Sequence, residues 1–275
     1  MGAPRLGRAA ELTAAARGDE GLRRARALLH EADRVVVLTG AGISAESGVP
    51  TFRGPDGLWR SHRPEDLATP EAFRRDPRLV WEWYAWRRSV VSRCAPNEGH
   101  RALARLVMRG RPTTTLVTQN VDGLHHRAAS EVAGADVERC RPLEVHGAID
   151  RDRCSACGAR SPGTPHVDAT SLETLPRCGC GGLLRPDVVW FGEALDGGVL
   201  GAAFAAAREA DVCLVVGTSA LVHPAASIPV VTLDCGGAVV EVNTEPTPLT
   251  SWASLSLRGT AASLVPALTE APSSE

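Results

Sequence analysis

The chain has 275 residues, with 30 basic and 32 acidic side chains and a formal net charge of -2. This length predicts either one large domain or a domain with an inserted lobe. The charge balance excludes a global field that would draw the protein to nucleic acid or to a membrane surface. No apolar run approaches the roughly 20 residues of a membrane span, and no signal-peptide hydrophobic region is present, so we expect a cytoplasmic protein.

Helical and strand patterns alternate along the chain. Leu22, Ala25 and Leu29 recur at helical spacing before a β-branched strand at residues 35–38. Thr69-Pro70 and Asp76-Pro77 have the residue types that begin helices. Apolar, β-branched runs suit a parallel sheet buried on both faces, so we predict an α/β fold. Further strands are predicted at residues 113–118, 143–146, 188–191, 212–216, 230–233 and 239–243.

A glycine-rich run at residues 39–54 follows the first predicted strand. Gly40-x-Gly42-x-x-Ala45 satisfies a loose dinucleotide fingerprint, in which backbone N–H groups approach a pyrophosphate. The same pattern also marks a plain strand-to-helix turn. The acidic residue expected about 20 positions later is missing, because a Pro-rich loop with Glu65 and Asp66 stands there. The pattern predicts a dinucleotide site unlike that of an ordinary dehydrogenase.

Polar residues follow three other predicted strands, where ligands bind in open α/β sheets. Asn120 and Asp122 alternate with apolar neighbours, so they either point into one crevice or form an Asx-turn. Residues 217–219 (Gly-Thr-Ser) and Asn243 end two more strands. These positions predict a polar crevice along one edge of the sheet.

His146 ends another predicted strand beside the same crevice. A histidine there is either structural or a general base, because imidazole titrates near neutral pH and can accept a hydroxyl proton. The sequence leaves both roles open for His146.

Four cysteines form two close pairs, Cys154-x-x-Cys157 and Cys178-x-Cys180. Four thiolates at this spacing predict a closed tetrahedral Zn²⁺ site, which is structural and not hydrolytic. His166 is a reserve ligand, and free thiols are the alternative. A zinc ribbon that binds nucleic acid is disfavoured, because the segment has little basic and aromatic interleaving.

With these motifs assembled, the chain resembles the sirtuins, NAD-dependent protein-lysine deacylases, from about residue 20 to residue 268. The matching motifs occur in family order, and His146-Gly147 leads into the cysteines. The other motifs are GAGISAESGVPTFR (40–53), TQNVDGLH (118–125), LLRPDVVWFGE (183–193), GTS (217–219) and EVN (241–243).

The resemblance implies a domain organisation. A Rossmann-like domain with a parallel sheet is expected from residues 20–60, 110–150 and 186–270. A smaller lobe is expected from a helical insertion at 61–109 and a zinc ribbon at 151–185, with one structural Zn²⁺. NAD and acyl-lysine would lie in the cleft between. Residues 1–19 and 271–275 are expected to be flexible tails.

The resemblance also implies site residues. His146 would act as base on a ribose hydroxyl, while nicotinamide and O-acyl-ADP-ribose are released. Asn120 and Asp122 would organise the nicotinamide ribose, and the loop through Arg53 would close over the cofactor. The substrate peptide would pair as an added strand with Val188, Val189, Trp190, Phe191 and Gly192. Cofactor contacts are implied for Gly40, Ala41, Gly42, Ser44, Phe52, Arg53, Gln119, Asn120, Val121, Asp122, Gly217, Thr218, Ser219, Asn243 and Ala261.

The acyl preference is argued from Tyr84 and Arg87. Three apart on a helix, they share a face, so a hydroxyl and a guanidinium can converge on one carboxylate. A core tyrosine with a surface arginine is the alternative. The spacing resembles the class III sirtuins, which implies removal of succinyl, malonyl or glutaryl groups, alongside acetyl.

Two other functions remain open on these residues. Protein mono-ADP-ribosyltransfer would use the same activated ribose, and a non-catalytic NAD-sensing module would use the ribbon for docking. The protein substrates, the ranking of acyl groups and the oligomeric state are left open.

Overall fold

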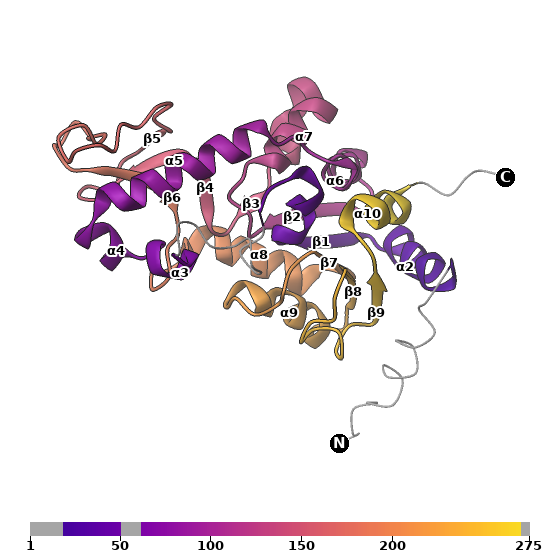
Figure 1. Ribbon diagram of the computed structural model, residues 1–275. Coiled ribbons are helices and arrows are strands. Elements are labelled where there is room, and N and C mark those ends of the chain that lie inside the picture. The colour runs from indigo at the N-terminus through magenta and orange to yellow at the C-terminus, as the bar shows by residue number, and fades with distance from the viewer. Residues whose placement is uncertain (1–18, 51–61, 271–275) are drawn as a thin grey trace, which may run out of the picture.

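The computed structural model describes residues 19–50 and 62–270. A larger part is built on a six-stranded sheet, and a smaller part combines three helices with a three-stranded sheet (Figure 1). The predicted α/β fold with a Rossmann-like sheet and a smaller lobe is confirmed. Among the described helices, none has the length and apolarity needed to cross a bilayer.

The main sheet has the strand order β3-β2-β1-β7-β8-β9, and all neighbouring strands are parallel. Counted within this sheet, the order is 3-2-1-4-5-6, as in doubly wound dinucleotide folds. The order reverses between β1 and β7, so a ligand crevice is expected beyond their carboxyl ends. The strands are β1 (Arg34–Thr39), β2 (Thr113–Thr118), β3 (Leu143–Glu144), β7 (Val212–Val216), β8 (Ala238–Asn243) and β9 (Leu255–Arg258).

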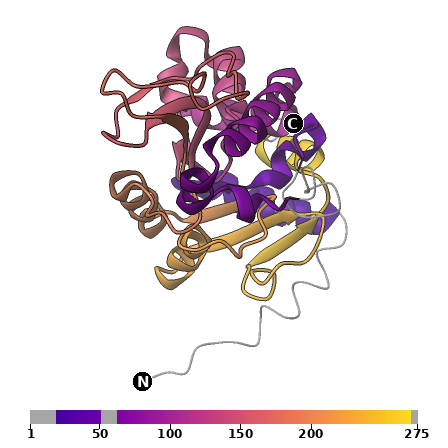
Figure 2. The same cartoon turned by 60° about the vertical axis from the view of Figure 1, so that its left-hand side comes forward.

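Helices cover both faces of the sheet (Figure 1, Figure 2). The alternation along β1 shows why: Val35 and Val37 join one buried cluster, and Val36 and Leu38 join the other. The first face carries α2 (Asp19–Glu31), α6 (Glu98–Arg109) and α10 (Ala261–Thr269), and the second carries α8 (Gly197–Glu209) and α9 (Ile228–Asp234). The connections contain α7 (Leu124–Ala133), η1 (Ala41–Ser47), η3 (Gly134–Cys140) and η4 (Ala225–Ser227).

The smaller part has its own core. Thr69 and Asp76 cap two consecutive helices, each followed by proline, as predicted. Trp81 and Tyr84 are fully buried against Val188 and other apolar side chains of the small sheet. The elements are α3 (Pro64–Leu67), α4 (Pro70–Arg75), α5 (Pro77–Arg93), and antiparallel β4 (Gly147–Cys154), β5 (Arg160–Pro162) and β6 (Leu184–Val188).

A buried ion pair holds α5 on the small sheet. Arg88 Nη2 lies 2.6 Å from Asp152 Oδ1, and the Asp152 side chain is 0% exposed. The other oxygen of this carboxylate accepts from the backbone N–H (2.7 Å) and the hydroxyl (2.6 Å) of Thr164. We call this cluster of Arg88, Asp152 and Thr164 the α5 clamp.

Several predictions of secondary structure were wrong. Residues 230–233 lie in α9, which has Pro229 in its first turn. The strand predicted at 188–191 is β6, which ends at Val188 and belongs to the small antiparallel sheet. The strand predicted at 143–146 is reduced to its first two residues. Helix α6, which the sequence assigned to the helical lobe, packs in the core of the main sheet.

Candidate active site

The loops after β1 and β7 touch at the point where the strand order reverses. Gly42 N–H donates to the carbonyl of Gly217 (2.8 Å), and Gly40 N–H donates to Val216 (3.0 Å). A Cβ on Gly42 would lie 2.7 Å from Gly217 Cα, so no side chain fits there. The glycines therefore allow the two loops to pack. A phosphate at this turn would be held by other donors, because these two N–H groups are engaged.

Ser44 lies at the centre of a buried network beside this turn. Its hydroxyl donates to Asp122 Oδ2 (2.7 Å). It accepts from Asn120 Nδ2 (3.2 Å) and from His100 Nε2 (3.3 Å). Asn120 Nδ2 also donates to the Gly40 carbonyl (3.0 Å). The Ser44 hydroxyl is thus taken up by the network, and a phosphate contact here would need its backbone.

Asn120 and Asp122 are 8% and 9% exposed. Burial raises the pKa of Asp122, and hydrogen bonds from the Leu124 N–H and the Ser44 hydroxyl oppose that rise. The predicted Asx-turn is also present, because Asp122 Oδ1 accepts from Leu124 N (2.9 Å). One carboxylate therefore shapes the turn with one oxygen and joins the network with the other.

Two buried histidines that were not among the predicted site residues, His100 and His125, support this network. His100 Nδ1 accepts from the Asn97 backbone in a capping box, so Nε2 carries the hydrogen that points to Ser44. Burial lowers the pKa of His100 to about 4, which keeps it neutral. The ring of His125 packs edge-on against it at 4.9 Å. The helix-start pattern Asn97-x-x-His100 is the signal that could have found the first of them.

His146 lies in the turn between β3 and β4. Its Nδ1 donates to the carbonyl of Gln119 (3.0 Å), which leaves Nε2 as the free lone pair of the neutral ring. Burial lowers the pKa of His146, against the hydrogen bond to Gln119, which raises it. A neutral imidazole with a fixed tautomer has the protonation state that a general base needs.

A second set of contacts joins the ends of β2, β7 and β8. Gln119 Nε2 donates to Thr218 Oγ1 (2.9 Å), and Asn243 Nδ2 donates to the Thr218 carbonyl (2.8 Å). Ser219 follows in the same loop and is partly exposed. The structure thus brings residues from three strand ends to one edge of the sheet, as predicted.

The remaining residues predicted to contact the cofactor belong to neighbouring segments. Ala41 begins η1, and the Val121 carbonyl accepts from Ile149 N (2.8 Å). Ala261 begins α10, which is tied to η1 because Ala262 N donates to Glu46 Oε2 (2.9 Å). Phe52 and Arg53 lie outside the described residues.

Tyr84 and Arg87 share one face of α5, as predicted. The guanidinium carbon of Arg87 lies 4.9 Å from the ring centroid of Trp83 and 5.4 Å from that of Tyr84. Burial lowers the pKa of Arg87, while Tyr84 and Asp122 raise it.

Residues 188–192, proposed to receive a peptide, lie between the small sheet and the turn that follows it. Phe191 is 49% exposed. The N–H groups of residues 189–191 already donate hydrogen bonds within the chain. They donate to His146 O (2.9 Å), Glu193 Oε2 (2.8 Å) and Ala68 O (2.9 Å), in chain order. A peptide added as a strand would therefore have to bind other backbone groups of residues 188–192.

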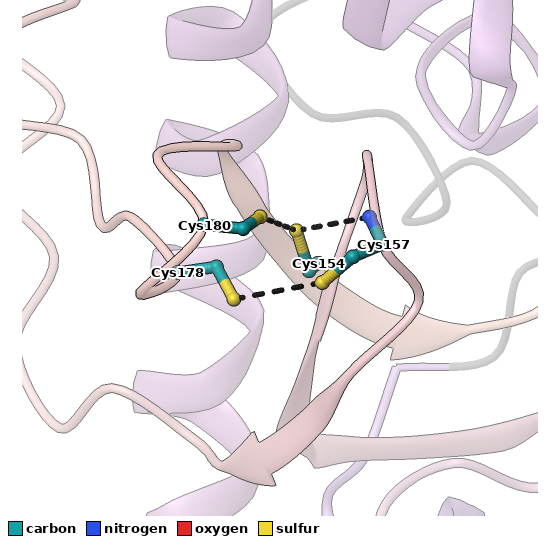
Figure 3. Close-up of side chains that lie close together, drawn as sticks. All are labelled: Cys154, Cys157, Cys178 and Cys180. Atoms are coloured by element: carbon teal, nitrogen blue, oxygen red, sulfur yellow. Dashed lines mark hydrogen bonds between the residues drawn. The ribbon is translucent and has the colours of Figure 1, made fainter.

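Four cysteine sulfurs converge within residues 151–185, the segment predicted to be a zinc ribbon (Figure 3). All lie within 4.8 Å of one another, and the facing pairs are Cys154–Cys180 (3.5 Å) and Cys157–Cys178 (3.7 Å). Backbone N–H groups of Cys157 and Ala156 hold the pKa of Cys154 below its usual range. Four thiols at these separations fit one tetrahedral Zn²⁺. Within the described residues, His166 is outside this cluster.

The geometry also fits a dinucleotide. The polar residues lie where the strand order reverses, and they follow the carboxyl ends of parallel strands. The buried amide and carboxylate of Asn120 and Asp122 are suited to ribose hydroxyls or a carboxamide.

Comparison with known proteins agrees with this geometry. The profile of the Sir2 family matches residues 40–224, more than half of the chain. An NAD-dependent protein deacylase of Pyrococcus furiosus is 49% identical over 246 residues, covering 88% of this chain and 94% of that protein.

Solved structures agree as well. A Sir2 homologue in complex with NAD superposes with a TM-score of 0.79 at 45% identity, covering 90% of this chain and 92% of that chain. A Sir2 complex with a p53 peptide and NAD⁺ superposes with a TM-score of 0.76 at 30% identity, covering 89% and 95%. The chain belongs to the Sir2 family.

Proposed function

We propose that this chain is an NAD-dependent protein-lysine deacylase. The observation that carries the proposal is the placement of His146, which is half-buried, neutral and held in one tautomer by the carbonyl of Gln119, the residue before Asn120. The relative from Pyrococcus furiosus bears the name NAD-dependent protein deacylase, and a solved relative binds NAD.

NAD would supply a ribose that takes up the acyl group, while its bond to nicotinamide breaks and one water is consumed to release the free lysine. The role of the chain is to hold this ribose and move one proton. Asn120 and Asp122 orient the nicotinamide end, and His146 Nε2 accepts a proton from a ribose hydroxyl. Thr218, Ser219 and Asn243 line the adenosine half.

The substrate is a protein lysine that carries an acyl group. A solved relative binds a p53 peptide together with NAD⁺, which supports a peptide substrate. We place this peptide along residues 188–192, where Phe191 is exposed and the strip leads directly from β6.

We further propose that the enzyme removes succinyl, malonyl or glutaryl groups as well as acetyl. Tyr84 and Arg87 support this preference, because together they offer a hydroxyl and a positive charge on one face of α5. A carboxylate at the end of an acyl chain would gain a charge-assisted hydrogen bond from Arg87.

The test is one peptide that carries acetyl-, succinyl-, malonyl- or glutaryl-lysine in turn, incubated with and without NAD. We expect acyl loss and nicotinamide release in equal amounts, and only with NAD. Acyl loss without NAD, or no nicotinamide with any of the four peptides, would contradict the proposal.

A further inference from the structure

The hydroxyl of Tyr84 accepts a hydrogen bond from a neighbouring indole. Trp190 Nε1 donates to Tyr84 Oη (2.8 Å), and the guanidinium carbon of Arg87 lies 5.4 Å from the centroid of the Tyr84 ring. The indole N–H is a donor and offers no lone pair to the hydroxyl hydrogen. The O–H bond of Tyr84 is therefore directed away from the indole, and its hydrogen can be donated to another acceptor.

The protonation state of the Tyr84 hydroxyl also suits a hydrogen-bond donor. Tyr84 is 0% exposed, and burial raises its pKa, against Arg87 and Trp190, which lower it. The phenol therefore keeps its proton at neutral pH and acts as a donor. Beside it, Arg87 is half-buried along α5.

Contacts of both the backbone and the ring hold Trp190 in place. The Trp190 backbone N–H donates to Glu193 Oε2 (2.8 Å). The guanidinium carbon of Arg185 lies 3.8 Å from the ring centroid, and Phe73 packs at 5.4 Å between centroids. Arg185 is itself fixed by two hydrogen bonds to Glu193 (2.6 and 2.8 Å). With the ring fixed, its N–H has one direction, toward Tyr84.

We propose that Trp190 is a specificity-determining residue for acyl groups that end in a carboxylate. Its N–H orients the Tyr84 hydroxyl so that the hydroxyl hydrogen points to the acyl carboxylate, beside the charge of Arg87. An acetyl group has no carboxylate and gains nothing from this orientation. The inference rests on the proposed deacylase function and adds a third residue to the acyl pocket.

The test is Trp190→Phe, which keeps an aromatic ring and removes the N–H. We expect the ratio of kcat/KM for the succinylated peptide to that for the acetylated peptide to fall about 5-fold, the size of one lost hydrogen bond. In a Tyr84→Phe background the same substitution leaves the ratio unchanged, because the hydroxyl is already gone.

Trp81→Phe is the matched control. Trp81 is also fully buried in the same core, and its Nε1 donates to the Leu184 carbonyl (2.9 Å) instead of Tyr84. We expect this variant to lose stability and to keep the acyl ratio.

The inference is overturned if Trp190→Phe lowers both activities equally, if Trp81→Phe lowers the ratio as much, or if the effect persists without the Tyr84 hydroxyl. A wild-type enzyme that cleaves acetyl-lysine alone overturns this inference and leaves the deacylase function standing. Absence of NAD-dependent activity on both peptides overturns the function and the inference together.

Discussion

Arg87 contacts two aromatic rings of the helical lobe through its guanidinium. We expect Arg87→Met to cost on the order of 2 to 4 kcal/mol in transition-state binding of a succinylated peptide, through loss of a charge-assisted pair. The loss on an acetylated peptide should be far smaller. Steady-state kcat/KM on the two peptides measures both.

Arg93→Met is the control, because Arg93 is an exposed arginine at the end of the same helix. Its substitution should leave both values unchanged. Equal losses on both peptides in Arg87→Met would remove Arg87 from the acyl pocket.

His146 acts as a base in its neutral form. Burial lowers its pKa below the ordinary value of 6.5, so the neutral form persists to lower pH. The kcat/KM profile should therefore be flat near neutral pH and fall as pH drops through a midpoint below 6.5. His146→Ala should abolish turnover and leave NAD binding measurable by calorimetry. Retained turnover in this variant would remove His146 from the mechanism.

Among the residues of the candidate site, those that directly follow a strand could be predicted from the sequence. The contacts of residues that pack behind them could not. Asn120 and Asp122 could be predicted, because position after a strand fixes where they lie. The helix-start pattern could have pointed to His100, but not its contact with Ser44, because that contact joins helix α6 to the turn after β1, far apart in the chain. No local pattern encodes such a pairing.

At the scale of elements, the α5 clamp links the helix that carries Tyr84 and Arg87 to β4. Removing one partner of a buried ion pair leaves the other charge uncompensated. Asp152→Ala should therefore lower the free energy of unfolding by about 3 to 5 kcal/mol, measured by urea denaturation.

Glu71→Ala is the comparison, because the Glu71–Arg74 pair is mostly exposed. It should change the free energy of unfolding by less than about 1 kcal/mol. If Asp152→Ala costs no more than Glu71→Ala, the clamp does not hold α5 in place.

The errors in predicted strands have physical causes. Residues 230–233 are β-branched and apolar, which suits a strand, but Pro229 stands in the first turn of the helix that forms there. Strand β6 contains Arg185 and Pro186, and pairs antiparallel with the charged strand β4. Neither β4 nor β6 has the apolar pattern of a buried parallel strand. The strands of the main sheet were predicted well where both faces are buried, as in 35–38 and 212–216.

In the molecule as a whole, the zinc ribbon at residues 151–185 is the part whose stability depends on four cysteines. A metal bound by the folded state stabilises it, so a chelator should remove one Zn²⁺ per chain and lower the melting temperature. Cys178→Ser should abolish metal binding, measured by elemental analysis. Cys235→Ser should not, because Cys235 is exposed and outside the cluster. Full metal content in Cys178→Ser would contradict the four-thiol site.

We propose that the enzyme transfers an acyl group from lysine to the ribose of NAD. The most direct measurement is mass spectrometry of a succinylated peptide and the nucleotide after incubation with the enzyme and NAD. We predict free lysine on the peptide and O-succinyl-ADP-ribose in equal amount. ADP-ribose attached to a protein, with the succinyl group still on lysine, would contradict the claim.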